Sequence, residues 1–210
     1  MIERISEWKK EVGTEKDLYS VFKTSVLEVG NKKDAGLVGL LFFALESVGV
    51  LLLLVHKLPH GIRVASWLQG FSGVMVSAVA SILGFLIAGF AIFATIGHQK
   101  LFQGLAQIRH PGSRLSEFKF VFFNFIYIFI HFVSYISLLA FSVVMFVSGP
   151  ALTFLVSIAD YMPSIAWRFG MFQAFVIFVC YTVYILLLLK SFIWNLYQSL
   201  LVVIFFEPPQ

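Results

Sequence analysis

The sequence predicts an all-α integral membrane protein with four transmembrane helices. Of its 210 residues, 60% are hydrophobic and 12% are charged, whereas soluble domains carry about 25% charged residues. A soluble domain of this length cannot bury so much apolar surface, so we expect most of it to face lipid. Four apolar runs reach the length of about 20 residues that a helix needs to cross roughly 30 Å of hydrocarbon.

The four expected spans cover about residues 35–55, 70–96, 118–147 and 170–189. Together with their loops they form a four-helix domain over residues 35–190. Gly149-Pro150 ends the third run, because proline cannot continue a helix easily. Lys190 interrupts the fourth run and marks its expected end.

Residues 1–34 are expected to form a cytoplasmic amphipathic helical segment. Ile5, Trp8 and Val12 recur at helical spacing and make one apolar face. Seven acidic residues balance seven basic ones here, so strong binding to anionic lipid is not expected. A surface for a partner protein, or packing beneath the membrane domain, suits the segment better, and Ile5, Trp8 and Val12 are the candidate partner-binding residues.

A second helix is expected after the break at Gly13. Thr14 with Asp17 resembles a capping box that opens it. Leu18, Phe22 and Val26 then repeat every four residues, which is typical of one helix face.

Residues 191–210 are expected to form a helical tail. The fourth span and this tail could also make one continuous helix from Gly170 to Phe206, which at about 1.5 Å per residue exceeds the bilayer thickness. Two arrangements remain open. The helix either tilts and emerges into the cytoplasm, or kinks near Lys190 and lies in the interface.

The distribution of lysine and arginine predicts the orientation of the spans. One side would carry twelve: Arg4, Lys9, Lys10, Lys16, Lys23, Lys32, Lys33, Lys100, Arg109, Arg114, Lys119 and Lys190. The other side would carry three: Lys57, Arg63 and Arg168. Because cytoplasmic loops are enriched in these residues, both termini are expected in the cytoplasm.

Glu46 is a carboxylate near the middle of the first span. A charge there costs at least about 2.5 kcal/mol on insertion scales, so such a residue usually faces a bundle interior or a water path. Glu46 is therefore either an ion- or proton-handling group, or a protonated acid hydrogen-bonded between helices. His131 lies at a similar depth and could form a proton-coupled pair with it, or simply join helices. Asn124 and Gln173 are interpreted in the same way.

The second span carries two ridges of small residues at every fourth position. The ridges consist of Gly73, Ser77 and Ser81, and of Ala80, Gly84 and Ala88. Such ridges let helix backbones approach closely, either within one protomer or between protomers. Since the spans leave no sizeable soluble domain, we expect a homo-oligomer that buries these ridges and Glu46.

Motifs for catalysis are missing from the sequence. It contains no HExxH, GxSxG, Walker or GxGxxG pattern. Its single cysteine, Cys180, excludes an internal disulfide and a cysteine-based metal cluster. The excess of Lys and Arg over Asp and Glu, 15 against 11, is too small to suggest a nucleic-acid surface. We expect a non-enzymatic protein without catalytic residues, cofactor, metal or direct contact with nucleic acid.

The run from Ser81 to Thr95, SILGFLIAGFAIFAT, looks like a segment common in small bacterial membrane proteins of mobile defence loci. With four spans and a charged N-terminal helix, the chain resembles the KwaA family of membrane subunits from Kiwa-type anti-phage systems. The resemblance implies a homo-oligomeric sensor in the bacterial inner membrane. Its partner would be KwaB, a cytoplasmic DNA-binding effector, and its trigger an infection-induced disturbance of the envelope. No residue role is carried over.

These observations together predict a non-enzymatic sensor or scaffold for a cytoplasmic partner. One alternative is a small ion-conducting pore that depolarises the membrane, which would need a polar stripe along a full span. The other is a transporter subunit, which usually binds substrate at broken helices near the midplane. The lack of a central proline in any span weakens the transporter interpretation.

Overall fold

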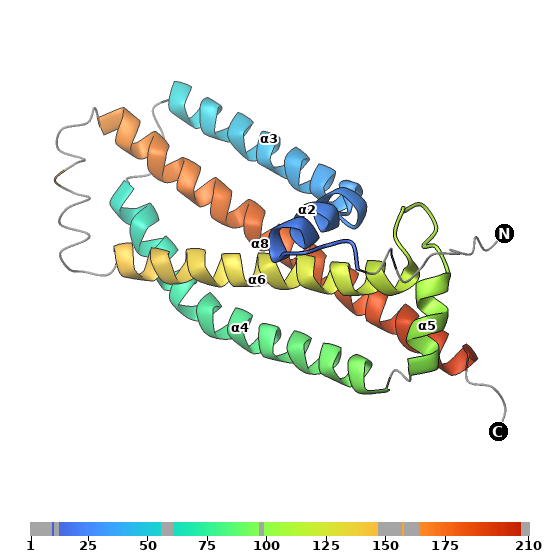
Figure 1. Cartoon of the computed structure of the whole chain (residues 1–210). Helices are drawn as coiled ribbons and strands as arrows, with labels where there is room; N and C mark the ends of the chain where they lie inside the picture. The colour runs from blue at the N-terminus through green and yellow to red at the C-terminus, as the bar shows by residue number, and fades with distance from the viewer. Residues whose placement is uncertain are drawn as a thin grey trace. The chain divides into compact units, whose positions relative to one another are not determined.

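The computed structural model describes residues 10, 13–55, 61–96, 99–146, 157 and 164–206. The helices are α2 (Leu18–Glu28), α3 (Lys32–Leu54), α4 (Gly61–Ile96), α5 (Gln99–Gln107), α6 (Glu117–Phe146) and α8 (Ser164–Phe206) (Figure 1). The described residues contain no strand, and their one isolated bridge joins Arg109 to Ser116. The predicted all-α class is confirmed.

Four of these helices are long and apolar enough to cross a membrane. They cover Lys32–Leu54, Arg63–Thr95, Glu117–Met145 and Ser164–Gln198. The four-span prediction is confirmed, but α4 and α8 begin several residues before the predicted spans. Arginine is a good helix former, so Arg63 and Arg168 continue the helices into segments that the apolar runs did not include.

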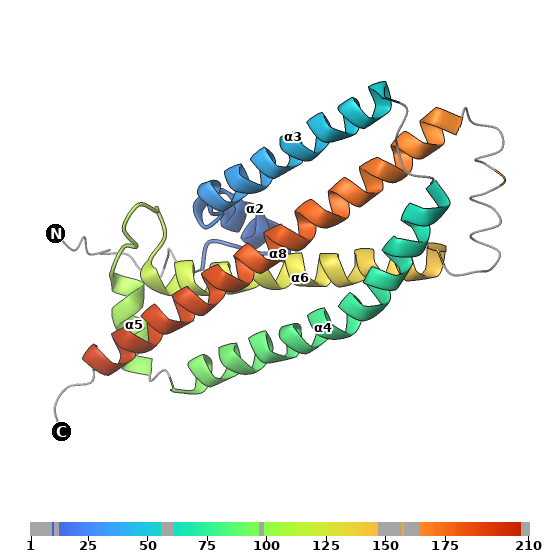
Figure 2. The same cartoon turned by 180° about the vertical axis from the view of Figure 1, so that it is seen from behind.

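Helix α8 runs unbroken through Lys190 to Phe206 (Figure 2). The fourth span and the tail thus form one continuous helix, a possibility that the sequence left open. Lysine is a good helix former, and Lys190 is exposed, so its charge does not oblige the helix to end. With 43 residues, α8 is about 64 Å long, roughly twice the thickness of the hydrocarbon core.

The chain divides into two compact units. Unit 1 comprises Met1–Asn31, Leu83–His131 and Leu188–Gln210, and unit 2 comprises Lys32–Ile82 and Phe132–Leu187. Helices α4, α6 and α8 contribute residues to both units, and each unit is described below by itself.

In unit 2, α3 packs along the first half of α8. Phe172, Val176 and Cys180 of α8 form a buried cluster, against which α3 packs Val38, Leu41, Phe42, Leu45, Leu52 and Leu53. Gly49 is buried, and a Cβ there would collide with the ring of Phe172. Much of the remaining surface of α3 is exposed, with Leu40 and Phe43 each 72% accessible. Exposed apolar side chains of this size suit contact with lipid.

Two hydroxyl contacts join the other helices of unit 2. Ser72 of α4 donates a hydrogen bond to Ser142 of α6, with 3.1 Å between the buried Oγ atoms. The hydroxyls of Tyr135 and Thr182 lie 2.6 Å apart and link α6 to α8. Hydrogen bonds of this kind are a common way of joining helices in a membrane.

In unit 1, a closed loop connects α5 to α6. The backbone N–H of His110 donates to the carbonyl of Leu115 over 2.9 Å, and that of Glu117 to the carbonyl of Ile108 over 2.8 Å. Gly112 at the tip has φ +82°, a left-handed conformation that glycine adopts without strain. The loop is thereby held as a compact turn.

Helix α2 is capped by Asp17. The backbone N–H of Ser20 donates to Asp17 Oδ1 over 2.6 Å, and this bond, with that of the Ser20 hydroxyl, lowers the pKa of the Asp17 carboxyl. The predicted capping role of Thr14 is wrong, because the aspartate caps the helix itself. Of the predicted apolar face, Phe22 stacks on Tyr127 of α6, whereas Leu18 and Val26 are exposed.

Candidate functional site

Glu46 of α3 forms an interhelical hydrogen bond in unit 2. Gln173 of α8 donates from Nε2 to Glu46 Oε2 over 2.8 Å. Glu46 Oε1 is buried and has no hydrogen-bond partner among the described residues. The surrounding contact between α3 and α8 is apolar. Leu45, directly before Glu46, and Phe172, directly before Gln173, both pack in it.

The geometry at Glu46 favours a structural role over an ion path. Oε2 is held by a neighbouring helix, and Oε1 is closed off within the protomer. A carboxylate that lined a pore would face a polar stripe, and the partly buried residues beside Glu46 on α3 are apolar.

His131 of α6 belongs to unit 1. Its ring centroid lies 4.6 Å from that of Tyr127, in an edge-to-face arrangement, and 6.4 Å from that of Phe22. The histidine is thus part of the aromatic contact that seats α2 on α6. Glu46 pairs with Gln173 in unit 2, and the proposed Glu46–His131 pair stays a prediction.

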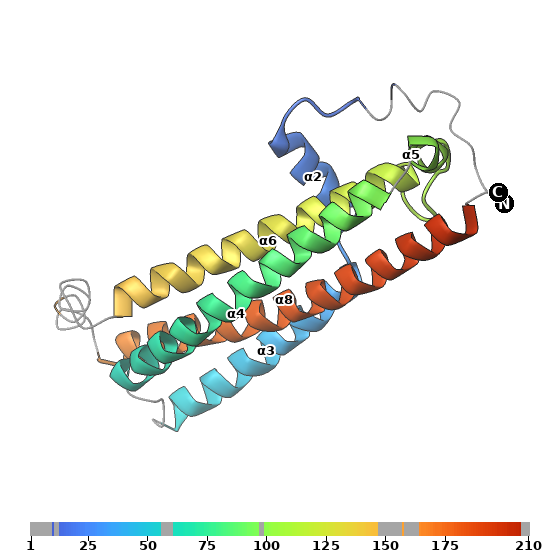
Figure 3. The same cartoon turned by 90° about the horizontal axis from the view of Figure 1, so that it is seen from below.

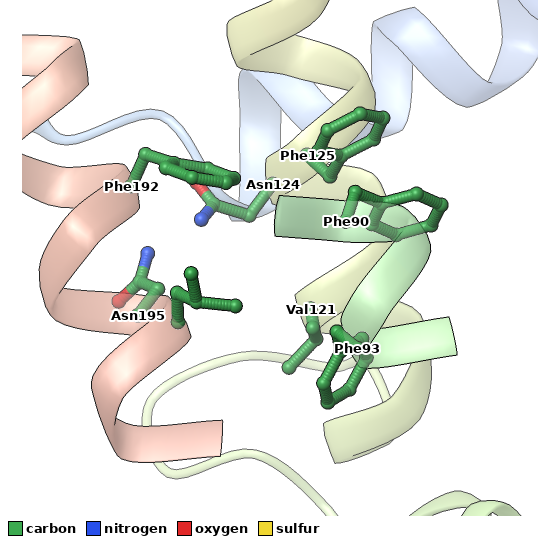
Figure 4. Close-up of a pocket in the computed structure, with 8 residues that line it drawn as sticks. Phe90, Phe93, Val121, Asn124, Phe125, Phe192 and Asn195 are labelled. Atoms are coloured by element: carbon green, nitrogen blue, oxygen red, sulfur yellow. The ribbon is translucent and has the colours of Figure 1, made fainter. Parts of the chain in front are cut away.

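Asn124 of α6 lines a small cavity in unit 1 (Figure 4). The cavity measures about 20 Å³ and is lined by Phe90, Phe93, Val121, Asn124, Phe125, Phe192, Asn195 and Leu196. Asn124 is 7% exposed, and its carboxamide points into the cavity together with that of Asn195 from α8 (Figure 4). Since a water molecule needs about 10–15 Å³, the cavity can hold one water between the two amides.

The small-residue ridges of α4 face outward. Gly73, Ser77, Ala80, Ser81, Gly84 and Ala88 are all exposed. A Cβ added at Gly73 or Gly84 would meet nothing within 4 Å. The buried residues of α4 lie on another face, where Ser72, Val79, Leu86 and Phe93 recur every seven residues. The described residues leave these positions exposed, and close packing of the ridges, within one protomer or between protomers, stays a prediction.

Lys119 ties the N-terminal segment to the start of α6. It is 3% exposed, and its Nζ lies 2.5 Å from Glu15 Oε2 and 2.8 Å from Thr14 Oγ1. The same ammonium lies 5.2 Å from the ring centroid of Phe123. A buried cation is stable only when it is paired and hydrogen-bonded, and Glu15 and Thr14 provide both interactions.

Glu28 makes a second connection at the other end of α2. Its Oε2 accepts hydrogen bonds from Ser113 Oγ and from the backbone N–H of Arg114, each over 3.0 Å. We call the set of Thr14, Glu15, Glu28, Ser113, Arg114 and Lys119 the polar platform. Sequence reasoning missed it, although acids in residues 1–34 and bases in the loop after the second span were the available signal.

The three candidate partner-binding residues, Ile5, Trp8 and Val12, lie outside the described residues. The described part of the chain contains no group of three or more His, Cys, Asp or Glu side chains that could hold a metal. Cys180 packs in the apolar cluster with Phe172 and Val176. Comparison of the chain with protein-family models, curated proteins and solved structures found no match.

Proposed function

We propose that this multi-pass membrane protein is a non-enzymatic, homo-oligomeric sensor or scaffold. In this proposal it resides in the bacterial inner membrane with both termini in the cytoplasm. There it recruits or regulates a cytoplasmic partner in anti-phage defence, the setting that the resemblance to the KwaA family implies. The observation that carries the proposal is the polar platform of unit 1.

The polar platform supports a role in presenting the N-terminal segment. Two long-range connections, Lys119 to Glu15 and Glu28 to the loop at Ser113, fix residues 14–28. Burying an ion pair contributes little net stability but can define a single arrangement. The residues before Thr14 are therefore attached to an anchored segment. Such an attachment suits a surface to which a partner protein binds.

The charge distribution supports a cytoplasmic position for unit 1. Its ranges contain ten of the 15 lysines and arginines, namely Arg4, Lys9, Lys10, Lys16, Lys23, Lys100, Arg109, Arg114, Lys119 and Lys190. By the positive-inside rule, the termini and the loop that carry these residues would lie on the cytoplasmic side. A cytoplasmic partner would then meet the segment that carries Ile5, Trp8 and Val12.

The exposed small residues of α4 support the homo-oligomer. Helix interfaces in membranes are enriched in glycine, alanine and serine, because these let backbones approach closely. Among the described residues, a Cβ added at Gly73 or Gly84 would meet no atom within 4 Å. A second copy is therefore the partner that we propose for this face.

Two observations speak against the alternatives. For a pore, Glu46 would have to face an ion path, whereas its carboxyl lies in the contact between α3 and α8. For a transporter subunit, broken helices would be expected near the midplane, whereas α4, α6 and α8 each run as one helix.

The proposal can be tested in bacteria that carry the full chain with its neighbouring genes. Deleting residues 2–13 should abolish capture of the cytoplasmic partner and raise phage plating efficiency, while insertion and assembly stay intact. Trp8→Ala should weaken both effects, because aromatic anchors dominate most interfaces. Lys16→Ala, an exposed position, is the control and should change neither. Protection and partner capture at full yield in the deletion variant would contradict the proposal.

A further inference from the structure

Helix α2 exposes an apolar face. Leu18 is 65% accessible, Tyr19 75%, Val26 44% and Leu27 65%. The opposite face is held by the protein, since Ser25 is fully buried and Phe22 stacks on Tyr127. A helix on a water-exposed surface has the reverse pattern, with polar residues outward. Another apolar phase is needed to cover this face.

The contacts of α2 place it against a membrane span. Phe22 packs on Tyr127 and His131, which lie ten or more residues inside α6. Figures 1 and 3 both show α2 beside α6. Helix α6 is one of the four apolar helices that could cross the bilayer. Helix α2 therefore lies beside a helix that is long and apolar enough to cross the bilayer.

The connection to α3 limits the distance of α2 from the bilayer. Helix α2 ends at Glu28 and α3 begins at Lys32. Four residue steps span at most about 14 Å. Because α3 turns apolar directly after Lys32-Lys33-Asp34, its first turn lies at the membrane surface. The end of α2 is tethered within that short distance of it.

We propose that α2 lies in the membrane–water interface, with Leu18, Tyr19, Val26 and Leu27 inserted among phospholipid acyl chains. Tyrosine favours this region because its ring is apolar and its hydroxyl can stay in water. Lys23, which shares the exposed face, extends its ammonium towards the headgroups. The contact depends on apolar burial, so it does not require anionic lipid. It is independent of the proposed function.

The depth of α2 can be measured on the full chain in lipid nanodiscs. In a Cys180→Ser background, a nitroxide is attached to a cysteine that replaces Tyr19 or Leu27, and its collisions with oxygen and with a water-soluble nickel chelate are recorded. Both labels should favour oxygen, in phosphatidylcholine alone and with added phosphatidylglycerol. Phe43→Cys on the lipid-facing side of α3 is the lipid control. Gln103→Cys, at an exposed polar position of α5, is the water control.

Two results would overturn the proposal. Nickel accessibility at residues 19 and 27 equal to that at residue 103 would show a water-facing surface. Immobile labels shielded from both reagents would show that a second copy or another protein covers the face. If either substitution prevents folding, Leu18→Cys and Val26→Cys probe the same face and carry the same two criteria.

Discussion

Gln173 donates a hydrogen bond to Glu46 across the contact between α3 and α8, over 2.8 Å. Replacing Glu46 with glutamine keeps an acceptor for this bond. We expect Glu46→Gln to leave assembly, ion flux and viability nearly unchanged. Glu46→Ala removes the acceptor and should destabilise the fold by about 1–3 kcal/mol, measured by thermal unfolding in nanodiscs. A Glu46→Gln variant that alters conductance while the oligomer survives would instead establish the ion-path interpretation.

The close approach of α3 to α8 depends on Gly49. A Cβ at this position would enter the space of the Phe172 ring. Gly49→Ala should therefore force a shift of the helices and destabilise the protein by about 1–3 kcal/mol, the usual range for overpacking. Gly39→Ala on the same helix is the matched control, because a Cβ there meets nothing within 4 Å. The control should be neutral or slightly stabilising, since alanine favours helix more than glycine, and equal effects at both positions would contradict this account.

Mutating the two members of the ion pair between Lys119 and Glu15 should reduce stability by unequal amounts. Lys119 is 3% exposed, so Glu15→Ala leaves a buried cation without its counter-charge, and such losses cost about 3–5 kcal/mol. Lys119→Met removes the charge and keeps the apolar stem, so its cost should be clearly smaller. The release of residues 14–28 is measured by limited proteolysis, as the rate at which the N-terminal segment is cut while α6 stays intact. A larger loss from Lys119→Met than from Glu15→Ala would contradict the explanation.

The apolar runs were sufficient to predict the four spans, because the requirement for about 20 apolar residues acts on each segment independently. Helix ends were predicted less well. The continuation of α8 through Lys190 depends on helix propensity and exposure, which an apolar-run criterion does not measure. The Glu46–Gln173 bond and the Lys119–Glu15 pair join residues more than 100 positions apart. Many pairings of polar residues were compatible with the sequence, so it could identify Glu46 as unusual but not its partner.

The predicted orientation can be checked with an impermeant thiol reagent. In a Cys180→Ser background, single cysteines replace Ser6 and Tyr161. Because the lysine and arginine bias is twelve to three, position 161 should be labelled from outside intact cells, and position 6 only after permeabilisation. Labelling at position 6 but not at 161 in intact cells would reverse the orientation.

The last prediction concerns the outward face of α4. At about 100° per residue, Ser77 lies roughly 140° around the helix from the buried Ser72. Ser77→Leu and Gly84→Leu add bulk where the protomer offers open space, so folding should be unaffected. If a second copy packs closely on this face, each substitution should weaken self-association at least about tenfold, which is about 1.4 kcal/mol. Val74→Leu, on a neighbouring exposed position, is the control. Mass photometry in nanodiscs gives the stoichiometry. A wild-type monomer, or an oligomer that persists unchanged with leucine at both positions, would show that this face contacts lipid alone.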